Sequence, residues 1–322
     1  MASTSKRRSW QDVPAELTES ILRRLGAIDL LLSARKVCKM WRRICSDPNL
    51  YRVVEFWYTG DPDEVINYIV QYIARKVVEL SCGQLALFSI TYFADDRHLN
   101  YVLRRSSQLR CLHLASCKKI TAERLLKVVY NLPKLDELHL YCIDISKHVV
   151  RAIGHCCPQL KTFRLNYHGN KEQCIGFDKN ALAIAENMPG LCHLQLFGNT
   201  ITRNGLLAIL KNCPHLESLD IRQCFQAGNL EPALIRCLSH RMKYLRLPYD
   251  STEDSALNDI YALYSNGDDD YYYYDDDDRY ILSDIEIVPD DYGYHSDGYD
   301  YYNDDYDYNE NSGGSDIDSD LC

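Results

Sequence analysis

The chain has 322 residues, of which 46% are hydrophobic and 25% charged, an ordinary balance for a protein that folds in water. No apolar run is long enough to cross a bilayer, and the start, MASTSKRRSW, lacks the apolar centre of a signal peptide. We therefore expect no membrane partner and a cytoplasmic or nuclear location.

Residues 9–54 are predicted to form three short helices, after a flexible N-terminus at 1–8. Gly26 suits a left-handed cap at the end of the first helix. The second helix is predicted to begin at Asp29, as its N-cap, and to continue to Ile44. The sequence Asp-Pro-Asn then breaks this helix before a third short element.

The order and spacing of residues in this stretch resemble an F-box. The positions that agree with the family pattern are Pro14, Glu16, Leu17, Ile21, Leu22, Leu25, Asp29, Leu30, Val37, Cys38, Trp41, Pro48 and Leu50. Val13 and Tyr51 depart from it, because the family usually has Leu and Trp there. The resemblance implies that the stretch binds a Skp-type adaptor, and through it a cullin. The residues implied for adaptor binding are Pro14, Leu17, Ile21, Leu22, Leu25, Leu30, Val37 and Trp41.

A second pattern, L-x-x-L-x-L, recurs at intervals of 26, 25, 31, 25 and 26 residues. Its six copies are Leu109/Leu112/Leu114, Leu135/Leu138/Leu140, Leu160/Phe163/Leu165, Leu191/Leu194/Leu196, Leu216/Leu219/Ile221 and Met242/Leu245/Leu247. This period predicts leucine-rich repeats, whose units cannot bury their apolar sides alone. The predicted fold class is therefore α/β: a three-helix F-box, then a short right-handed solenoid at 55–250. Its parallel strands line the concave face and its helices lie outside.

Other positions of the repeat are also informative. N-caps are predicted at Thr121, Ser146, Asp178 and Thr202. Buried side chains are predicted before proline at Leu132, Cys157, Met188 and Cys213, and in the turns at Cys117, Asn199 and Cys224. This resembles the cysteine-containing leucine-rich repeats that often follow an F-box, as in the shorter plant proteins of this kind. The 14 cysteines form no CxxC pair, so we expect neither disulfides, nor a metal site, nor a cofactor.

The ends of the solenoid are less regular. A degenerate first unit is expected at Val77–Leu80, and residues 55–73 are expected to join the F-box to the solenoid and cap it. The interval of 31 residues predicts a protruding loop at 167–172.

The positions between the leucines should face the inner surface, where solenoids usually bind partners. We expect an unidentified substrate protein to contact Arg110, His113, Asp136, His139, Lys161, Arg164, His193, Gln195, Asp220, Tyr244 and Arg246. The alternative for each position is an ordinary solvated sheet face, since every such repeat has polar residues there.

Residues 251–322 form an acidic, tyrosine-rich tail. They contain 23 Asp and Glu, a single basic residue, Arg279, and 14 of the 25 tyrosines, so their net charge is −22 and that of residues 1–250 is +12. Charges at this density repel one another, and the tail is expected to be disordered, except for a strand or docking motif at 281–288. Two interpretations stay open: a solvating extension, or a tail that competes with an acidic substrate for the basic body.

No motif typical of an enzyme is present: GxSxG, a Walker loop, HExxH and GxGxxG are all absent. The resemblance implies a non-catalytic receptor subunit of a Skp–cullin–F-box ubiquitin ligase, which brings a substrate protein to the ligase for ubiquitination. Two alternatives remain. One is a repeat scaffold that recruits no ligase; the other is a nucleic-acid-binding protein, suggested by Lys6-Arg7-Arg8 and the basic body but opposed by the mixing of acidic and basic residues.

Overall fold

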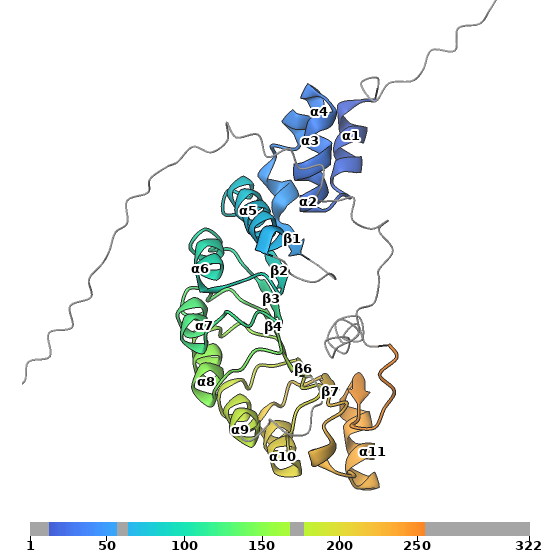
Figure 1. Ribbon diagram of the computed structural model, residues 1–322. Helices are drawn as coiled ribbons and strands as arrows, with labels where there is room; N and C mark the ends of the chain where they lie inside the picture. Colours follow the sequence, from blue (N-terminus) through green and yellow to red (C-terminus); the bar gives the residue numbers. More distant parts are fainter. Residues whose placement is uncertain (1–12, 57–63, 168–176, 255–322) are drawn as a thin grey trace, which may run out of the picture. The chain divides into compact units, whose positions relative to one another are not determined.

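The computed structural model describes residues 13–56, 64–167 and 177–254 (Figure 1). The acidic tail beyond residue 254 and most of the loop predicted at 167–172 lie outside these ranges. No helix in the described ranges is both long enough and apolar enough to cross a membrane.

The described strands form one parallel sheet in which each strand pairs with the next along the chain. The strands are β1 (Val53–Phe56), β2 (Leu87–Thr91), β3 (Cys111–Ala115), β4 (Glu137–Tyr141), β5 (Thr162–Asn166), β6 (His193–Gln195), β7 (Ser218–Asp220) and β8 (Tyr244–Arg246). The six predicted copies of the repeat coincide with β3 to β8. The predicted leucine-rich-repeat architecture is therefore confirmed.

Helices alternate with the strands and lie along one side of the sheet (Figure 1). They are α5 (Glu64–Leu80), α6 (Asp96–Arg104), α7 (Ala122–Val129), α8 (Lys147–Cys156), α9 (Phe177–Asn187), α10 (Arg203–Asn212) and α11 (Pro232–Arg241). The core lies between the two layers, where Leu112, Leu138 and Phe163 are in register on neighbouring strands and fully buried. Parallel strands with their helices on one face bury the apolar side that a single unit would leave exposed.

The start of the sheet differs from the prediction. Val77 and Leu80 belong to the end of helix α5, not to a strand, and the first complete unit uses β2 instead. The hexad of this unit is Leu85/Phe88/Ile90, in which Phe and Ile replace two of the three leucines. Strand β1 was also missed; it pairs with β2 and joins the F-box directly to the sheet.

The N-terminal helices are shorter than predicted. They comprise α1 (Ala15–Leu22), α2 (Ala27–Asp29), the π-helical turn η2 (Leu30–Ala34), α3 (Arg35–Val37), α4 (Lys39–Ile44) and the 3-10 turn η3 (Pro48–Tyr51). The prediction of one continuous second helix is wrong. The backbone of Cys38 is extended, and its sulfur accepts a hydrogen bond from the Trp41 N–H, so a new helix begins there. Gly26 is likewise no left-handed cap: it has φ −66° and occupies the N-cap position of α2.

The turn positions of the repeats behave as predicted. The thiols of Cys117 and Cys224 and the amide of Asn199 are buried and donate hydrogen bonds to main-chain carbonyls, as from Cys224 Sγ to the Leu196 oxygen at 2.8 Å. Burial raises the pKa of both thiols to about 12. Because the thiolate is the reactive form, these cysteines act as small buried side chains.

Two of the four predicted N-caps are confirmed by hydrogen bonds, at Thr121 and Thr202. Ser146 occupies the N-cap position of α8 without a side-chain cap bond. Asp178 is not an N-cap, because α9 already begins at Phe177. Its carboxylate instead accepts hydrogen bonds from the main-chain N–H and the hydroxyl of Thr202, so it ties one repeat to the next.

Replacing Thr121 by alanine should lower the free energy of unfolding by about 1 kcal/mol, the usual value of a threonine cap. The Thr121 hydroxyl accepts from the Arg124 N–H at 3.1 Å and donates to Asp96 at 2.8 Å. Ser146→Ala is the matched control and should cost less than about 0.5 kcal/mol. Urea denaturation measures both losses, and equal losses would contradict the importance of the Thr121 cap.

Candidate functional site

The eight residues that the F-box resemblance implied for adaptor binding fall into two groups. Leu22, Leu30 and Trp41 are buried and hold the helices together. Pro14 is exposed, and so are four large apolar side chains that we call the F-box surface: Leu17 (58% exposed), Ile21 (39%), Leu25 (37%) and Val37 (49%).

The exposure of the F-box surface is unusual for this protein. Eleven large hydrophobic residues are exposed in the described ranges, and five of them lie between residues 17 and 53. Leu17 and Ile21 stand four residues apart on α1, so they share one side of the helix. Contiguous exposed apolar side chains commonly mark a surface that another protein covers.

Tyr51, the residue that departs from the family's Trp, does not belong to this surface. Its side chain is fully buried, and its hydroxyl donates a hydrogen bond of 2.8 Å to the Cys45 carbonyl. The phenol therefore fills an internal position of the F-box. This departure from the family pattern leaves the exposed side of α1 unchanged.

The second candidate site is a groove of about 620 Å³ on the sheet face opposite the helices. Of the eleven predicted substrate-contacting residues, seven line it: His113, His139, Arg164, His193, Gln195, Asp220 and Tyr244. The other four, Arg110, Asp136, Lys161 and Arg246, do not. Arg110, Asp136 and Lys161 stand just before strands β3, β4 and β5, and Arg246 instead donates to the Tyr244 hydroxyl and pairs with Asp254.

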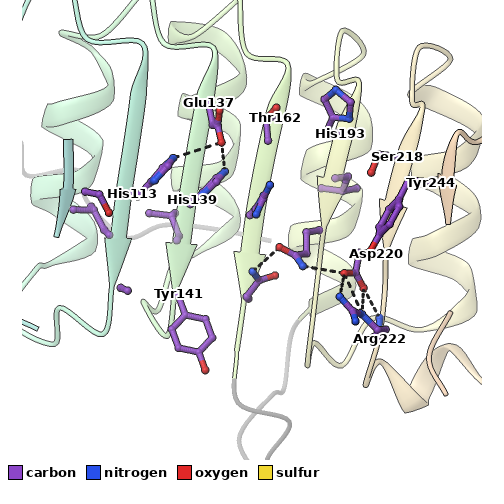
Figure 2. Close-up of a pocket in the computed structure, with 18 of the residues that line it drawn as sticks. His113, Glu137, His139, Tyr141, Thr162, His193, Ser218, Asp220, Arg222 and Tyr244 are labelled. Atoms are coloured by element: carbon purple, nitrogen blue, oxygen red, sulfur yellow. Dashed lines mark hydrogen bonds and ion pairs between the residues drawn. The ribbon is translucent and has the colours of Figure 1, made fainter. Parts of the chain in front are cut away.

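At one end of the groove two histidines flank a glutamate (Figure 2). The rings of His113 and His139 are stacked at 3.8 Å and nearly parallel, and their Nε2 atoms lie 3.5 and 2.6 Å from the same oxygen of Glu137. The contacts of His113 and then His139 hold the pKa of Glu137 well below its ordinary value. Burial lowers the pKa of His139 to about 4. Near neutral pH this end therefore presents a carboxylate beside an uncharged His139 imidazole.

At the other end a chain of polar side chains crosses three strands (Figure 2). The Asn166 amide donates to Gln195 at 3.1 Å, and the Gln195 amide donates to Asp220 at 2.9 Å. Asp220 in turn pairs with the buried guanidinium of Arg222 at 2.7 Å, and Arg222 also pairs with Asp254. Asp220 and Gln195 are thus occupied by internal contacts, although both were predicted to meet a substrate.

Sequence reasoning missed two residues of this face. Glu137 was not singled out, because its contact with both Nε2 atoms depends on side-chain orientations that the repeat pattern does not give. Arg222 follows β7 and lies outside the hexad positions, so the repeat pattern gave no reason to choose it. The available signal in the sequence was Asp220, an acidic residue two positions before it.

Comparison with known proteins agrees with this architecture. An F-box domain model matches residues 10–53, and the model "FBD-associated F-box protein At5g56370, LRR repeats" matches residues 70–176. F-box protein SKIP19 of Arabidopsis thaliana is 43% identical over 246 residues, which cover 76% of this chain and 79% of that protein. Putative F-box/LRR-repeat protein 23 of the same plant is 43% identical over 250 residues, covering 77% of this chain and 55% of that protein.

Putative F-box/LRR-repeat protein 9 of Arabidopsis thaliana is 41% identical over 220 residues, which cover 67% of this chain and 88% of that protein. In each case the similar region spans most of the described residues. Proteins of this kind are generally non-catalytic and typically serve as substrate adaptors. The chain therefore belongs to the F-box/leucine-rich-repeat family.

Proposed function

We propose that this protein is the substrate-recognition subunit of a Skp–cullin–F-box ubiquitin ligase, acting in the cytoplasm or the nucleus. The F-box surface binds the Skp-type adaptor, which connects to the cullin, and the groove of the sheet holds the substrate protein. The protein's own contribution is to hold the substrate close to the other subunits of the ligase, which carry out the transfer of ubiquitin.

The observation that carries the proposal is the exposure of Leu17, Ile21, Leu25 and Val37 at positions that match the F-box pattern. Burying such a residue completely is worth about 1.5–3 kcal/mol, and since each is still 37–58% exposed, a partner would add about 0.5–1.7 kcal/mol per residue. Internal packing already uses Leu22, Leu30 and Trp41. The F-box surface is therefore not needed to complete the protein's own core. A helix of a partner protein could pack against it.

Substrate recognition is assigned to the groove because it is concave, lies on the sheet and carries free polar groups. Arg164 and His193 are exposed in it, and Tyr244 is 42% exposed. Aromatic and arginine side chains often supply much of the affinity of a protein interface. The end of the groove near Asp220 is already paired internally, so contacts with a substrate should centre on β4 to β6 and on Tyr244.

The proposal is tested by purifying the full chain from plant cells with and without a proteasome inhibitor. Adaptor and cullin should co-purify with it, and a specific set of proteins should accumulate on it when the proteasome is blocked. A Leu17→Asp, Ile21→Asp variant should lose the adaptor and cullin while keeping the substrate proteins. The variant thus distinguishes adaptor binding by the F-box surface from substrate binding by the groove.

The alternatives predict different results. A repeat scaffold would retain its bound proteins but show neither adaptor nor cullin in the wild-type sample. A nucleic-acid-binding protein would shift duplex DNA or RNA in a salt-dependent manner. Either result, in the absence of co-purified adaptor, would overturn the ligase assignment.

A further inference from the structure

Three side chains with metal-binding atoms converge at one end of the groove. Strands β3 and β4 run in register, so His113 lies directly beside His139, and Glu137 precedes His139 by two residues on the same face. Their ligand atoms all lie within 4.8 Å of one another. Within the described part of the chain, this is the single group of three such residues.

Glu137 contacts the imidazole nitrogens, but not in the geometry of a hydrogen bond. The Nε2 atoms of His113 and His139 are buried, and neither has a hydrogen-bond partner of acceptable geometry in the described structure. Both are directed at one oxygen of Glu137, at 3.5 and 2.6 Å (Figure 2). A buried polar atom without a well-formed hydrogen bond costs free energy, so this arrangement calls for an explanation.

We propose that His113, Glu137 and His139 form a binding site for a divalent transition-metal ion, with Zn²⁺ as the best match. Two imidazole nitrogens and one carboxylate oxygen are a donor set that zinc accepts when a fourth coordination position is left open. A hard cation such as Ca²⁺ or Mg²⁺ fits poorly, because those ions prefer oxygen ligands only.

Binding requires a local adjustment of the two rings. The imidazoles are nearly parallel, with an interplanar angle of 3°, so their lone pairs do not yet meet at one point. A small opposite rotation of the two side chains would direct both Nε2 atoms at an ion next to Glu137. The strand backbones would not have to move, because the register already places the three residues together.

The remaining coordination position would face the groove, which is lined by the same three residues. If the groove holds the substrate, as proposed above, a bound ion could accept a ligand from that substrate. This consequence depends on the proposed function, whereas the metal site does not: it is tested on the isolated protein, without an adaptor or a substrate.

The test is a Co²⁺ titration of the full chain, followed by visible absorption and by competition with Zn²⁺. Cobalt in a site of two nitrogens and one oxygen should give visible bands without the near-ultraviolet thiolate band. The absence of that band would distinguish the site from binding by the many cysteines. His113→Ala, His139→Ala and Glu137→Gln should each weaken binding by more than about 100-fold, since even residues behind the ligands change affinity 10- to 100-fold.

Two controls make the result decisive. His193→Ala removes another histidine of the groove and should leave the affinity unchanged. Cys111→Ser tests a thiol beside the site, whose sulfur lies 3.8 Å from the other oxygen of Glu137, and should also leave the affinity unchanged. Zn²⁺ should raise the melting temperature of the wild-type chain and of both controls but not of Glu137→Gln. Unchanged binding by the three site variants, or a thiolate band in the wild type, would overturn the proposal.

Discussion

Replacing Leu17 and Ile21 together by aspartate should weaken binding to the Skp-type adaptor by more than about 100-fold. Leu17 and Ile21 are 58% and 39% exposed, so completing their burial is worth about 1.5–3 kcal/mol for the pair, and a loss of 3 kcal/mol corresponds to about two orders of magnitude in Kd. The introduced carboxylates add the cost of burying unpaired charges. Calorimetric titration of the purified full chain into the adaptor measures the loss.

The matched control places the same change on the repeats. Leu182 and Leu207 are also exposed, at 44% and 39%, but they lie on α9 and α10. Leu182→Asp with Leu207→Asp should therefore leave adaptor affinity unchanged. Both double variants should keep the wild-type circular dichroism, because all four residues lie at the surface, 39–58% exposed, and none belongs to the buried core. Equal affinity of the F-box variant and the wild type would show that this surface does not bind the adaptor.

Replacing Arg222 by methionine should lower the free energy of unfolding by about 3–5 kcal/mol. The guanidinium is 3% exposed, donates to Asp220 through two nitrogens and also contacts the Ser251 carbonyl and Asp254. Methionine can fill part of the space but leaves the buried Asp220 carboxylate without its countercharge. The sheet end at β7 and β8 should loosen first. Urea denaturation followed by circular dichroism measures the change.

Two further variants separate the ion pair from general packing. Arg222→Met combined with Asp220→Leu removes both charges and should recover much of the loss, because a pair replaced by apolar residues is often nearly neutral. Arg110→Met removes an exposed partner of Asp136, 3.4 Å away, and should change stability by less than about 0.5 kcal/mol. If Arg222→Met were as harmless as Arg110→Met, the buried pair would not hold this end of the sheet.

The repeat was the easiest feature to predict, because its signal combines period, leucine positions and turn residues. Strands β3 to β8 followed from the hexads, and the burial of Cys117 and Cys224 followed from their recurring place. Strand β1 was missed because VVEF contains no leucine, and β2 because Phe88 and Ile90 replace two leucines of the hexad that begins at Leu85. Their pairing is fixed by stacking on the next repeat, which a local pattern cannot reveal.

The positions of the F-box helices were predicted correctly, but their lengths were not. The periodicity of apolar residues across 30–44 fits one helix, whereas the backbone turns at Cys38 to begin α4. Tertiary packing sets such a break, and no glycine or proline in the sequence marks it. The division of the matched residues into a buried and an exposed group also needed the structure, since both kinds are apolar.

The two candidate sites differ in how much of each could be predicted from the sequence. The F-box surface could be proposed from the family pattern, because its residues lie close together along the chain. The cluster of His113, Glu137 and His139 could not: the hexads place His113 beside His139, but the convergence of the three donor atoms depends on side-chain orientation. The large number of cysteines suggested testing for a thiolate metal site, whereas the donor atoms that converge belong to two histidines and a carboxylate.

The measurement that tests the central claim most directly is titration of the intact chain with a purified Skp-type adaptor at several temperatures. The claim is that the F-box surface, exposed in the isolated protein, is covered by the adaptor. We predict one binding site per chain and a negative heat-capacity change, the mark of apolar burial on binding. An absence of binding heat at every temperature, with the two proteins eluting separately in gel filtration, would contradict the claim.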